Sequence, residues 1–402
     1  MSAPPQLGED LTVPSGKTQT AFVVRGIHDV AFESRPLPDE SALGADDVVV
    51  APKAISICGS DLIRLSKTGE KGGIGDFIVK EPMVLGHETA AVVTKLGSNV
   101  TSLKVGQRVA LEPGRSCRVC SDCKSGYYNR CSEMVFAATP PYDGTLTSFY
   151  TLPADLCYPL PENMSLEEGA LIEPMSVAVH AVHKVAQMPH AANVLVFGAG
   201  PVGLLTCAVA KGLGARQVIV VDIQESRLKF AKEQGLAYDY YVSPKPNEGE
   251  SKLDYPKRCA EEIRKQFGFD ERGPGGIDLV VDCSGAEVCV QTGLHALRHG
   301  GTLVTVGMGN PDINIPVHTV LVKELNIRGS FRYGAGCYKL ALDLVARGAV
   351  NLKALISHRY AFKDAKLAFE ANKAGKGQDG KPLTKAVIYG PTDEDASLVE
   401  NK

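Results

Sequence analysis

Four cysteines lie within fifteen residues in the first half of the chain. They follow the spacing Cys-x2-Cys-x2-Cys-x7-Cys and are Cys117, Cys120, Cys123 and Cys131. Four thiolates in a short polar loop suit a closed tetrahedral zinc site, which keeps no open position for chemistry. The spacing therefore predicts a structural zinc site in which metal binding is coupled to folding of the loop.

Two other interpretations of these cysteines stay open, namely two disulfides and an iron–sulfur cluster. The total of 11 cysteines is odd, and a disulfide framework is untypical of a reducing compartment. A zinc ribbon that binds nucleic acid is disfavoured, because the chain has 43 Lys and Arg against 46 Asp and Glu and a net charge of -3.

Three further segments present possible metal ligands. Cys58 stands in the sequence ICGSD, His87 and Glu88 are adjacent in GHE, and Glu173 interrupts the apolar run LIEP. Taken singly, they fit a buried cysteine, a hydrogen-bonded core histidine and a glutamate at a helix start. Together they supply a thiolate, an imidazole and carboxylates, which is the ligand mix of an open catalytic zinc site.

A glycine-rich turn follows the apolar run 194–197 and precedes a helix-forming stretch. Its pattern places Gly198, Gly200 and Gly203 in a GxGxxG motif. The first glycine permits a tight turn, the second lets a pyrophosphate approach the backbone, and the third lets helix and strand pack closely. The alternative is a glycine-rich turn that binds nothing, but the strand and helix around it favour a dinucleotide site.

Asp222 closes the next apolar run, 218–221. A carboxylate there accepts hydrogen bonds from the hydroxyls of an adenosine ribose and repels a 2′-phosphate, so it predicts NAD rather than NADP. Arg227 is close enough in sequence to bind a phosphate. We interpret it as covering the adenine or as pairing with a surface charge.

The elements that must position these residues change in character along the chain. Short β-branched runs at 21–26, 46–52 and 89–97 predict an all-β, barrel-like region. From about 193 to 309, apolar strands alternate with helical stretches, which is typical of a doubly wound parallel sheet. The runs 358–362 and 384–390 are predicted strands that return to the first domain. The charged segment 243–256 is predicted to be a solvated loop.

Length and composition match an ordinary globular protein of two or three domains. The chain has 402 residues, of which 44% are hydrophobic and 22% charged, and its first twenty residues do not resemble a targeting segment. No run is apolar enough to span a membrane. We therefore expect a cytoplasmic protein with neither nucleic acid nor membrane as its partner.

Several of these motifs, taken together, resemble those of the zinc-dependent medium-chain dehydrogenases. They are CGSD, LGHE, the four-cysteine lobe, ATPPYDGT, EEGALIEP, VFGAGPVG and SFRY. The resemblance runs from about Phe22 to Gly390. In having glutamate at position 173, the chain resembles the polyol branch of the family, which contains xylitol and sorbitol dehydrogenases. It implies an α/β protein in which a GroES-like β-barrel catalytic domain carries an inserted doubly wound Rossmann domain.

The resemblance also implies domain bounds. They are a flexible tail at 1–20, a zinc-binding catalytic domain at 21–178, an NAD-binding Rossmann domain at 179–330 and a return to the catalytic domain at 331–402. A homotetramer is usual in the family. Short strands near 314–317 and 328–331 are expected to pair between subunits.

Residue roles follow from the same resemblance, position by position. Cys58, His87 and Glu88 are implied as catalytic zinc ligands, and Glu173 as a ligand or as a partner of the zinc-bound water. Ser60 is implied to pass protons outward. Phe136, Thr139, Arg332 and Tyr333 are implied substrate contacts. Cofactor contacts are expected at Gly198, Gly200, Val202, Gly203, Asp222, Arg227, Val306 and Phe331.

The expected activity is reversible oxidation of a secondary hydroxyl of a sugar alcohol, with NAD, one catalytic zinc and one structural zinc. Xylitol to D-xylulose is the first expectation, and sorbitol to fructose the next. Arg64 stands where relatives have an aromatic residue. Because of this difference, L-arabinitol and galactitol are alternative expected substrates. A dehydrogenase of simple alcohols and a non-catalytic protein that binds dinucleotides are the other interpretations.

Overall fold

The computed structural model describes residues 18–26, 29–66 and 79–399. Residue contacts divide the chain into two compact units, and the first of them is built from both ends of the sequence. That unit comprises Met1–Glu173 and Leu352–Lys402, and the second comprises Pro174–Asn351. The domain bounds at 178/179 and 330/331 stay predictions, and residues 1–17 of the predicted tail lie outside the described residues.

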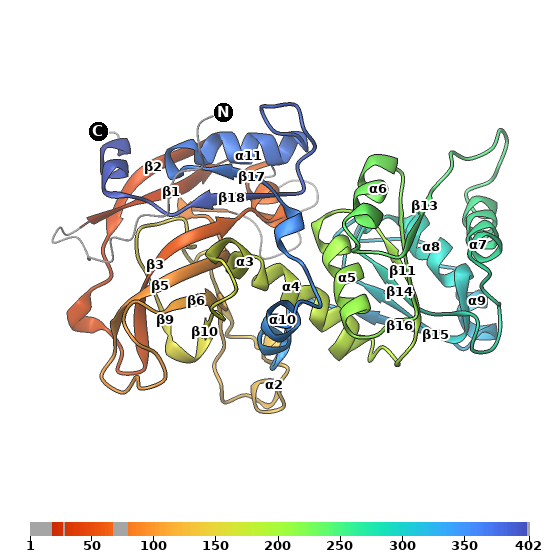
Figure 1. Cartoon of the computed structure of the whole chain (residues 1–402), viewed down its shortest axis with the longest axis horizontal. Helices are drawn as coiled ribbons and strands as arrows, with labels where there is room; N and C mark the ends of the chain where they lie inside the picture. Colours follow the sequence, from red (N-terminus) through yellow and green to blue (C-terminus); the bar gives the residue numbers. More distant parts are fainter. Residues whose placement is uncertain (1–17, 27–28, 67–78, 400–402) are drawn as a thin grey trace. The chain divides into compact units, whose positions relative to one another are not determined.

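The first unit is built on a seven-stranded sheet (Figure 1). Its path runs β10, β6, β5, β3, β18, β17, and β9 also pairs with β3. The strands are β3 (Asp47–Ser56), β5 (Glu88–Leu96), β6 (Arg108–Leu111), β9 (Tyr150–Pro153), β10 (Cys157–Pro159), β17 (Ile356–Tyr360) and β18 (Lys385–Tyr389). The predicted strands at 46–52 and 89–97 are confirmed, as is the return of 384–390 to this sheet.

A three-stranded sheet completes the β structure around the core of this unit. It consists of β2 (Asp29–Pro36), β1 (Thr18–Gly26) and β4 (Met83–Val84). Phe22 of β1, Ile55 of β3 and Phe369 of α11 (Ala365–Ala374) belong to one buried cluster. Apolar residues from both ends of the chain therefore share a core, and their burial is the main force that joins the ends.

Short elements complete the first unit. They are β7 (Gly114–Arg115), β8 (Val135–Phe136), α1 (Gly59–Ser66), α2 (Ser121–Lys124), α3 (Leu166–Ala170) and the short helices η1 (Glu40–Ala42), η3 (Tyr128–Arg130), η4 (Ala154–Leu156), η6 (Lys353–Leu355), η7 (Phe362–Asp364) and η8 (Asp393–Leu398). Helix α4 (Ile172–Val179) begins in the first unit and continues into the second.

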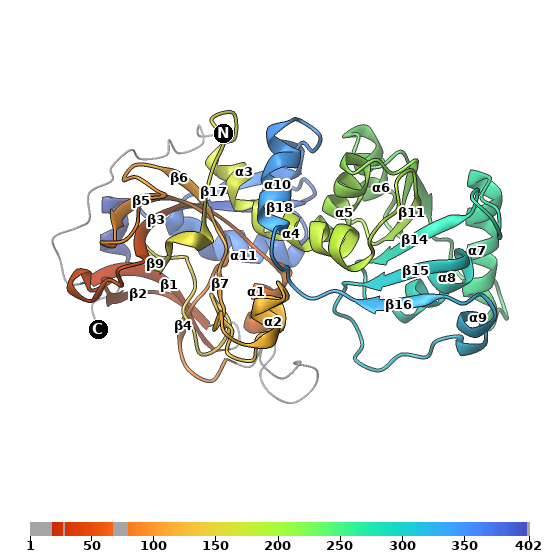
Figure 2. The same cartoon turned by 90° about the horizontal axis from the view of Figure 1, so that it is seen from below.

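The second unit is a doubly wound domain with a six-stranded parallel sheet (Figure 2). The strand order is β13, β12, β11, β14, β15, β16. These strands are β11 (Asn193–Phe197), β12 (Gln217–Asp222), β13 (Asp239–Val242), β14 (Ile277–Asp282), β15 (Leu297–Thr305) and β16 (Asn326–Gly329). In sequence terms the order is 3-2-1-4-5-6, the topology of dinucleotide-binding sheets.

Helices cover both faces of this sheet (Figures 1 and 2). The helices of the unit are α5 (Pro201–Gly212), α6 (Glu225–Glu233), α7 (Asp254–Phe267), α8 (Glu287–Ala296), α9 (Val317–Val322), α10 (Cys337–Ala346) and a π-helical turn at His180–Val185. Because both faces are covered, the central strands are continuous apolar runs rather than alternating ones. The predicted alternation of strands and helices is thus confirmed.

Two local predictions are wrong. The loop predicted at 243–256 ends at Leu253, because α7 begins at Asp254. Its Glu250 carboxylate is held by the Arg258 guanidinium at 2.7 and 2.8 Å. The run 314–317 is not a strand, since α9 begins at Val317. Among the described residues, no helix combines the length and the apolar character needed to cross a bilayer.

Candidate functional site

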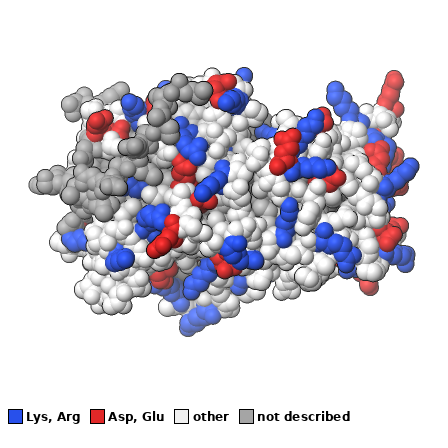
Figure 3. Space-filling model, in the orientation of Figure 1, with Lys and Arg blue, Asp and Glu red and all other residues white. Residues whose placement is uncertain are grey.

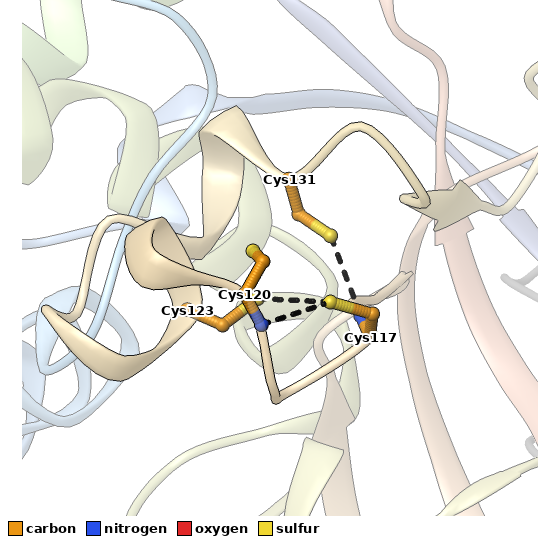
Figure 4. Close-up of side chains that lie close together, drawn as sticks. All are labelled: Cys117, Cys120, Cys123 and Cys131. Carbon is orange, nitrogen blue, oxygen red and sulfur yellow. Dashed lines mark hydrogen bonds between the residues drawn. The ribbon is translucent and has the colours of Figure 1, made fainter.

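The four predicted cysteine ligands converge in a lobe formed by residues 113–134 (Figure 4). Their sulfur atoms all lie within 4.8 Å of one another. The Sγ atoms of Cys117 and Cys123 are 3.9 Å apart, far longer than a disulfide bond, and all 11 cysteines are free thiols. The lobe thus holds the four sulfurs together without a covalent link.

Backbone amides stabilise the thiolate form inside the lobe. The N–H of Cys120 donates to Cys117 Sγ at 3.4 Å, and the N–H of Cys117 donates to Cys131 Sγ at the same distance. The amide of Cys120 is the main cause that lowers the pKa of the Cys117 thiol to about 7. The amide of Cys123 lowers the pKa of Cys120, but the side-chain contact with Cys123 and burial raise that pKa to about 11. The amide of Cys117 lowers the pKa of Cys131, but burial raises it above its ordinary value. A bound metal ion would deprotonate all four sulfurs, and four thiolates fit a closed zinc site.

Two polar contacts fasten the lobe to the sheet of the first unit. Tyr128 of the lobe and Tyr158 of β10 donate to the two carboxylate oxygens of Glu112, at 2.5 and 2.8 Å. Arg118 pairs with Asp155 at 2.7 Å. Burial raises the pKa of Glu112 to about 7. The Glu112 carboxylate is buried, so its hydrogen bond from Tyr128 contributes more to holding the lobe than the exposed Arg118 pair.

A second ligand cluster forms where the ends of β3 and β5 meet. Cys58 follows β3, His87 precedes β5, and Glu88 is the first residue of β5. Each of the three offers a ligand atom within 4.8 Å of the others. The pairing of Ser56 with Glu88 in the antiparallel register of β3 and β5 brings these segments together.

The turn before His87 depends on a glycine. Gly86 has a φ of +90°, and a Cβ there would lie only 3.0 to 3.2 Å from atoms of Leu146 and Ile55. A larger residue is therefore excluded by both conformation and space. This turn brings His87 and Glu88 from the loop into the buried end of the sheet, where they are 4% and 1% exposed.

Asp61 stands behind both the cysteine and the histidine. Its Oδ2 accepts the backbone N–H of Cys58 at 3.2 Å, and its Oδ1 lies 3.3 Å from Nδ1 of His87. Burial lowers the pKa of His87, but the charge of Asp61 raises it well above its ordinary value. With Nδ1 turned to Asp61, Nε2 is the nitrogen that suits a metal, an arrangement common around zinc.

The predicted proton carrier, Ser60, and one predicted pocket residue, Phe136, lie beside this cluster. The Ser60 hydroxyl donates to Cys58 Sγ at 3.2 Å. The ring of Phe136 lies 5.9 Å from the ring of His87, and the Thr139 amide donates to the Phe136 carbonyl at 3.0 Å. Glu173 is buried at the start of α4 and is not part of the three-residue cluster.

Glu88 has partners that sequence reasoning missed. Its Oε2 accepts hydrogen bonds from the hydroxyl of Ser56 and from the ammonium group of Lys385. Lys385 is itself a buried residue of β18. Asp61 was also missed as a positioning group, although it belongs to the CGSD motif. A lysine within the apolar run 385–389 was the signal for Lys385, but a local pattern does not say which residue lies opposite.

The glycine-rich turn of the second unit connects β11 to α5. Gly198 has a φ of +93°, and a Cβ at Gly203 would lie 1.7 Å from the Gly198 carbonyl oxygen. Gly200 caps α5, and the space around it is open. These glycines therefore have the three expected uses, namely a tight turn, an open approach to the helix N-terminus and close packing.

Asp222 ends β12, the strand beside β11. Its two oxygens accept the backbone N–H groups of Ala199 at 2.7 Å and of Gln224 at 2.9 Å. Since carboxylate oxygens accept more than one hydrogen bond, Asp222 keeps capacity for a ligand. Val202 is in the first turn of α5, and Arg227 is half-buried on α6.

The other predicted residues of this unit lie at its strand ends. Val306 follows β15, and its amide donates to the Asp282 carbonyl at 2.8 Å. The guanidinium carbon of Arg332 lies 4.8 Å from the exposed ring of Phe331, and Arg332 has an unusual φ of +52°. Tyr333 is buried against Tyr338, with ring centroids 5.2 Å apart.

Comparison with known proteins places both units in one family. Residues 44–162 match the family model of the alcohol dehydrogenase GroES-like domain, and residues 201–347 match that of the zinc-binding dehydrogenases. The chain is 52% identical over 360 residues to a probable D-xylulose reductase A of Aspergillus clavatus, covering 89% of this chain and 94% of the relative.

Two further proteins are similar to this chain over most of its length. The chain is 50% identical over 377 residues to D-xylulose reductase A of Aspergillus oryzae, covering 94% of this chain and 97% of the relative. The structure of L-idonate 5-dehydrogenase from Escherichia coli matches with a TM-score of 0.77 and 29% identity, covering 92% of this chain and 98% of that one. The predicted barrel and Rossmann fold is confirmed, and the chain belongs to the zinc-dependent medium-chain dehydrogenases, in their polyol dehydrogenase branch.

Proposed function

We propose that this polyol dehydrogenase interconverts xylitol and D-xylulose with NAD, and that sorbitol is its next substrate. The observation that carries the proposal is the buried cluster of Cys58, His87 and Glu88 with Asp61 behind it, in a chain half identical to D-xylulose reductases. L-Arabinitol and galactitol are the alternative substrates, because Arg64 stands where relatives have an aromatic residue.

The donor atoms fit one zinc ion at each site. Four sulfurs alone suit a closed structural site, whereas a thiolate, an imidazole and a carboxylate suit an open one. Bound zinc supplies Lewis acidity, which lowers the pKa of a hydroxyl group. In this proposal Cys58, His87 and Glu88 hold the ion. Asp61 fixes the His87 ring.

The reaction moves a hydride from the carbinol carbon of the polyol to the nicotinamide and releases the hydroxyl proton. Ser60 is our candidate for carrying that proton, because its hydroxyl lies beside Cys58. Glu173 is proposed as a ligand or as a partner of bound water. Phe136, Thr139, Arg332 and Tyr333 stay proposed substrate contacts, and Val306 and Phe331 stay proposed cofactor contacts.

NAD is the proposed cofactor because Asp222 presents a carboxylate at the end of β12, next to the glycine turn. A 2′-phosphate placed there would meet a negative charge. The proposed substrate is a neutral small molecule, which agrees with the mixture of basic and acidic side chains on the face in Figure 3. The free cysteines support our proposal of a cytoplasmic location.

We also propose that the protein is a homo-oligomer, a tetramer as is usual in the family, joined through the β16 edge. This strand is the last of its sheet (Figure 2). Val317, Leu321 and Val322 of α9 and Ile327 of β16 are exposed apolar side chains in the single chain. Exposed apolar side chains beside a strand edge are typical of an interface.

A panel of polyols tests the substrate. We expect kcat/KM with NAD to be highest for xylitol, followed by sorbitol, and far lower for a simple alcohol such as ethanol. L-Arabinitol and galactitol belong in the same panel. A preference for simple alcohols, or no oxidation of any polyol by the zinc-loaded protein, would disprove the proposed activity.

Removal of His87 or of the charge behind it tests the catalytic metal site. The wild type is expected to hold two zinc ions per chain and His87→Ala one, with turnover lost and NADH binding kept. Asp61→Asn should weaken zinc binding at this site about 10- to 100-fold. Asp379→Asn is the matched control, because it removes the carboxylate beside another histidine, His358, at 3.2 Å. Equal zinc affinity in Asp61→Asn and wild type would contradict the assignment.

Exchange of Asp222 tests the cofactor. In Asp222→Ser, kcat/KM for NAD should fall and that for NADP should rise, because the repelling charge is gone and a small donor takes its place. Asp239→Ser, at the start of the neighbouring strand β13, is the control and should leave the ratio unchanged. If the wild type already prefers NADP, Asp222 does not have the proposed role.

Light scattering tests the assembly. Leu321→Glu places a charge in the exposed apolar group of α9, so the molar mass should fall to that of a smaller species. Leu253→Glu changes a similarly exposed leucine elsewhere in the same unit and should leave the mass unchanged. A monomeric wild type, or an unchanged mass in Leu321→Glu, would rule out this interface.

A further inference from the structure

Lys385 is a buried lysine that the proposed reaction does not use. It is the first residue of β18, and only 2% of its surface is exposed. The antiparallel pairing of β18 with β3 sets Val387 opposite Ser56 and so delivers Lys385 to the end of β3. A segment close to the end of the sequence thereby enters the metal site.

The ammonium group of Lys385 is fully committed to that site. It pairs with Oε2 of Glu88, donates to the carbonyl of Ile57 at 3.1 Å, and lies 3.5 Å from Oγ of Ser56. Ser56 donates to the same oxygen of Glu88. Within the described part of the chain, Glu88 makes no side-chain hydrogen bond through its other oxygen. One carboxylate oxygen is therefore occupied by Ser56 and Lys385, and the other is left for a metal.

Charge gives this arrangement a consequence. A thiolate from Cys58 and a carboxylate from Glu88 would together cancel the charge of a divalent cation. The buried Lys385 cation offsets the Glu88 charge, so the site, in which Asp61 is a further anion, carries one more positive charge than it would without the lysine. Such a charge favours the anionic form of a substrate hydroxyl, because electrostatic effects are strong in a buried site.

A second buried lysine shows what a purely structural role looks like. Lys323, in the other unit, is 7% exposed and donates to the carbonyls of His295 and Leu297 at 2.9 and 3.1 Å. Its carboxylate partner, Glu271, is 56% exposed and belongs to no ligand cluster. Lys385 differs because its carboxylate partner is buried and adjacent to His87.

We propose that Lys385 is a positioning residue that restrains Glu88 and keeps it a weak, one-oxygen ligand of the catalytic metal. The restraint leaves a coordination position open for the substrate hydroxyl. This inference rests on the proposed function of the Cys58 and His87 site. Without Lys385, the unpaired carboxylate would bind the metal strongly and close that position.

The test measures the metal rather than turnover alone. Lys385→Met is prepared with zinc in the four-cysteine lobe and Co²⁺ at the Cys58 and His87 site. We expect Co²⁺ release to a chelator to slow about tenfold or more, in the range of effects of groups behind metal ligands. The visible Co²⁺ band should weaken as the coordination number rises, and kcat should fall more than KM changes.

Matched variants separate positioning from stability. The double variant Lys385→Met/Glu88→Gln removes both charges and should return the release rate and the Co²⁺ band toward wild type. Lys385→Arg keeps the charge and should stay close to wild type. Lys323→Met removes the other buried lysine and should leave both readouts unchanged, whatever it does to stability.

Each outcome decides the proposal. Unchanged or faster release in folded Lys385→Met overturns it. If that variant does not fold, Glu88→Gln decides. Because a weak ligand contributes little affinity, Co²⁺ release from Glu88→Gln should be less than about threefold faster than from wild type. Release that is 100-fold faster or more would contradict the proposal. The failure of the proposed function is distinguishable, since a wild type that binds no metal at this site or oxidises no polyol reveals it before any variant is made.

Discussion

The antiparallel pairing of β3 with β5 is the constraint on which the site of the first unit depends. It sets Ser56 opposite Glu88, and with them it brings Cys58 next to His87. Side chains along a strand alternate between faces, so a slip of one residue in this pairing would turn Glu88 to the other face and separate it from its partners. On its other side β3 pairs with β18, which adds Lys385. Three distant segments thus meet because they share one central strand.

Buried charge is tolerated there because each charged group has a partner. Asp61 faces His87, and Lys385 faces Glu88. An isolated charge at any of these positions would cost several kcal/mol of stability, so the set is retained or lost together. Glu112 follows the same principle beside the cysteine lobe, where two tyrosine hydroxyls satisfy its oxygens. The polar groups therefore shape the two candidate metal sites as much as the predicted ligands do.

The second unit obeys a simpler rule. The carboxyl ends of neighbouring parallel strands lie at one edge of the sheet, so Asp222 at the end of β12 meets the turn that follows β11. The contact of Gly203 with the Gly198 carbonyl lets α5 start close to the strand. Dinucleotide binding can be inferred from one short motif because all of these contacts are nearly local.

By itself, the sequence determined the donor types, the glycine turn, the central strands and the family, because each depends on residues close together in the chain. The run 314–317 is predicted as a strand, but it leads into α9, which begins at Val317. A short local pattern of β-branched residues does not distinguish a strand from a short helix. Only the tertiary structure decided that Asp61 lies behind His87 and that Lys385 lies against Glu88. These contacts depend on strand pairing between segments as far as 297 residues apart, and the register of such pairing is set by packing of the whole core.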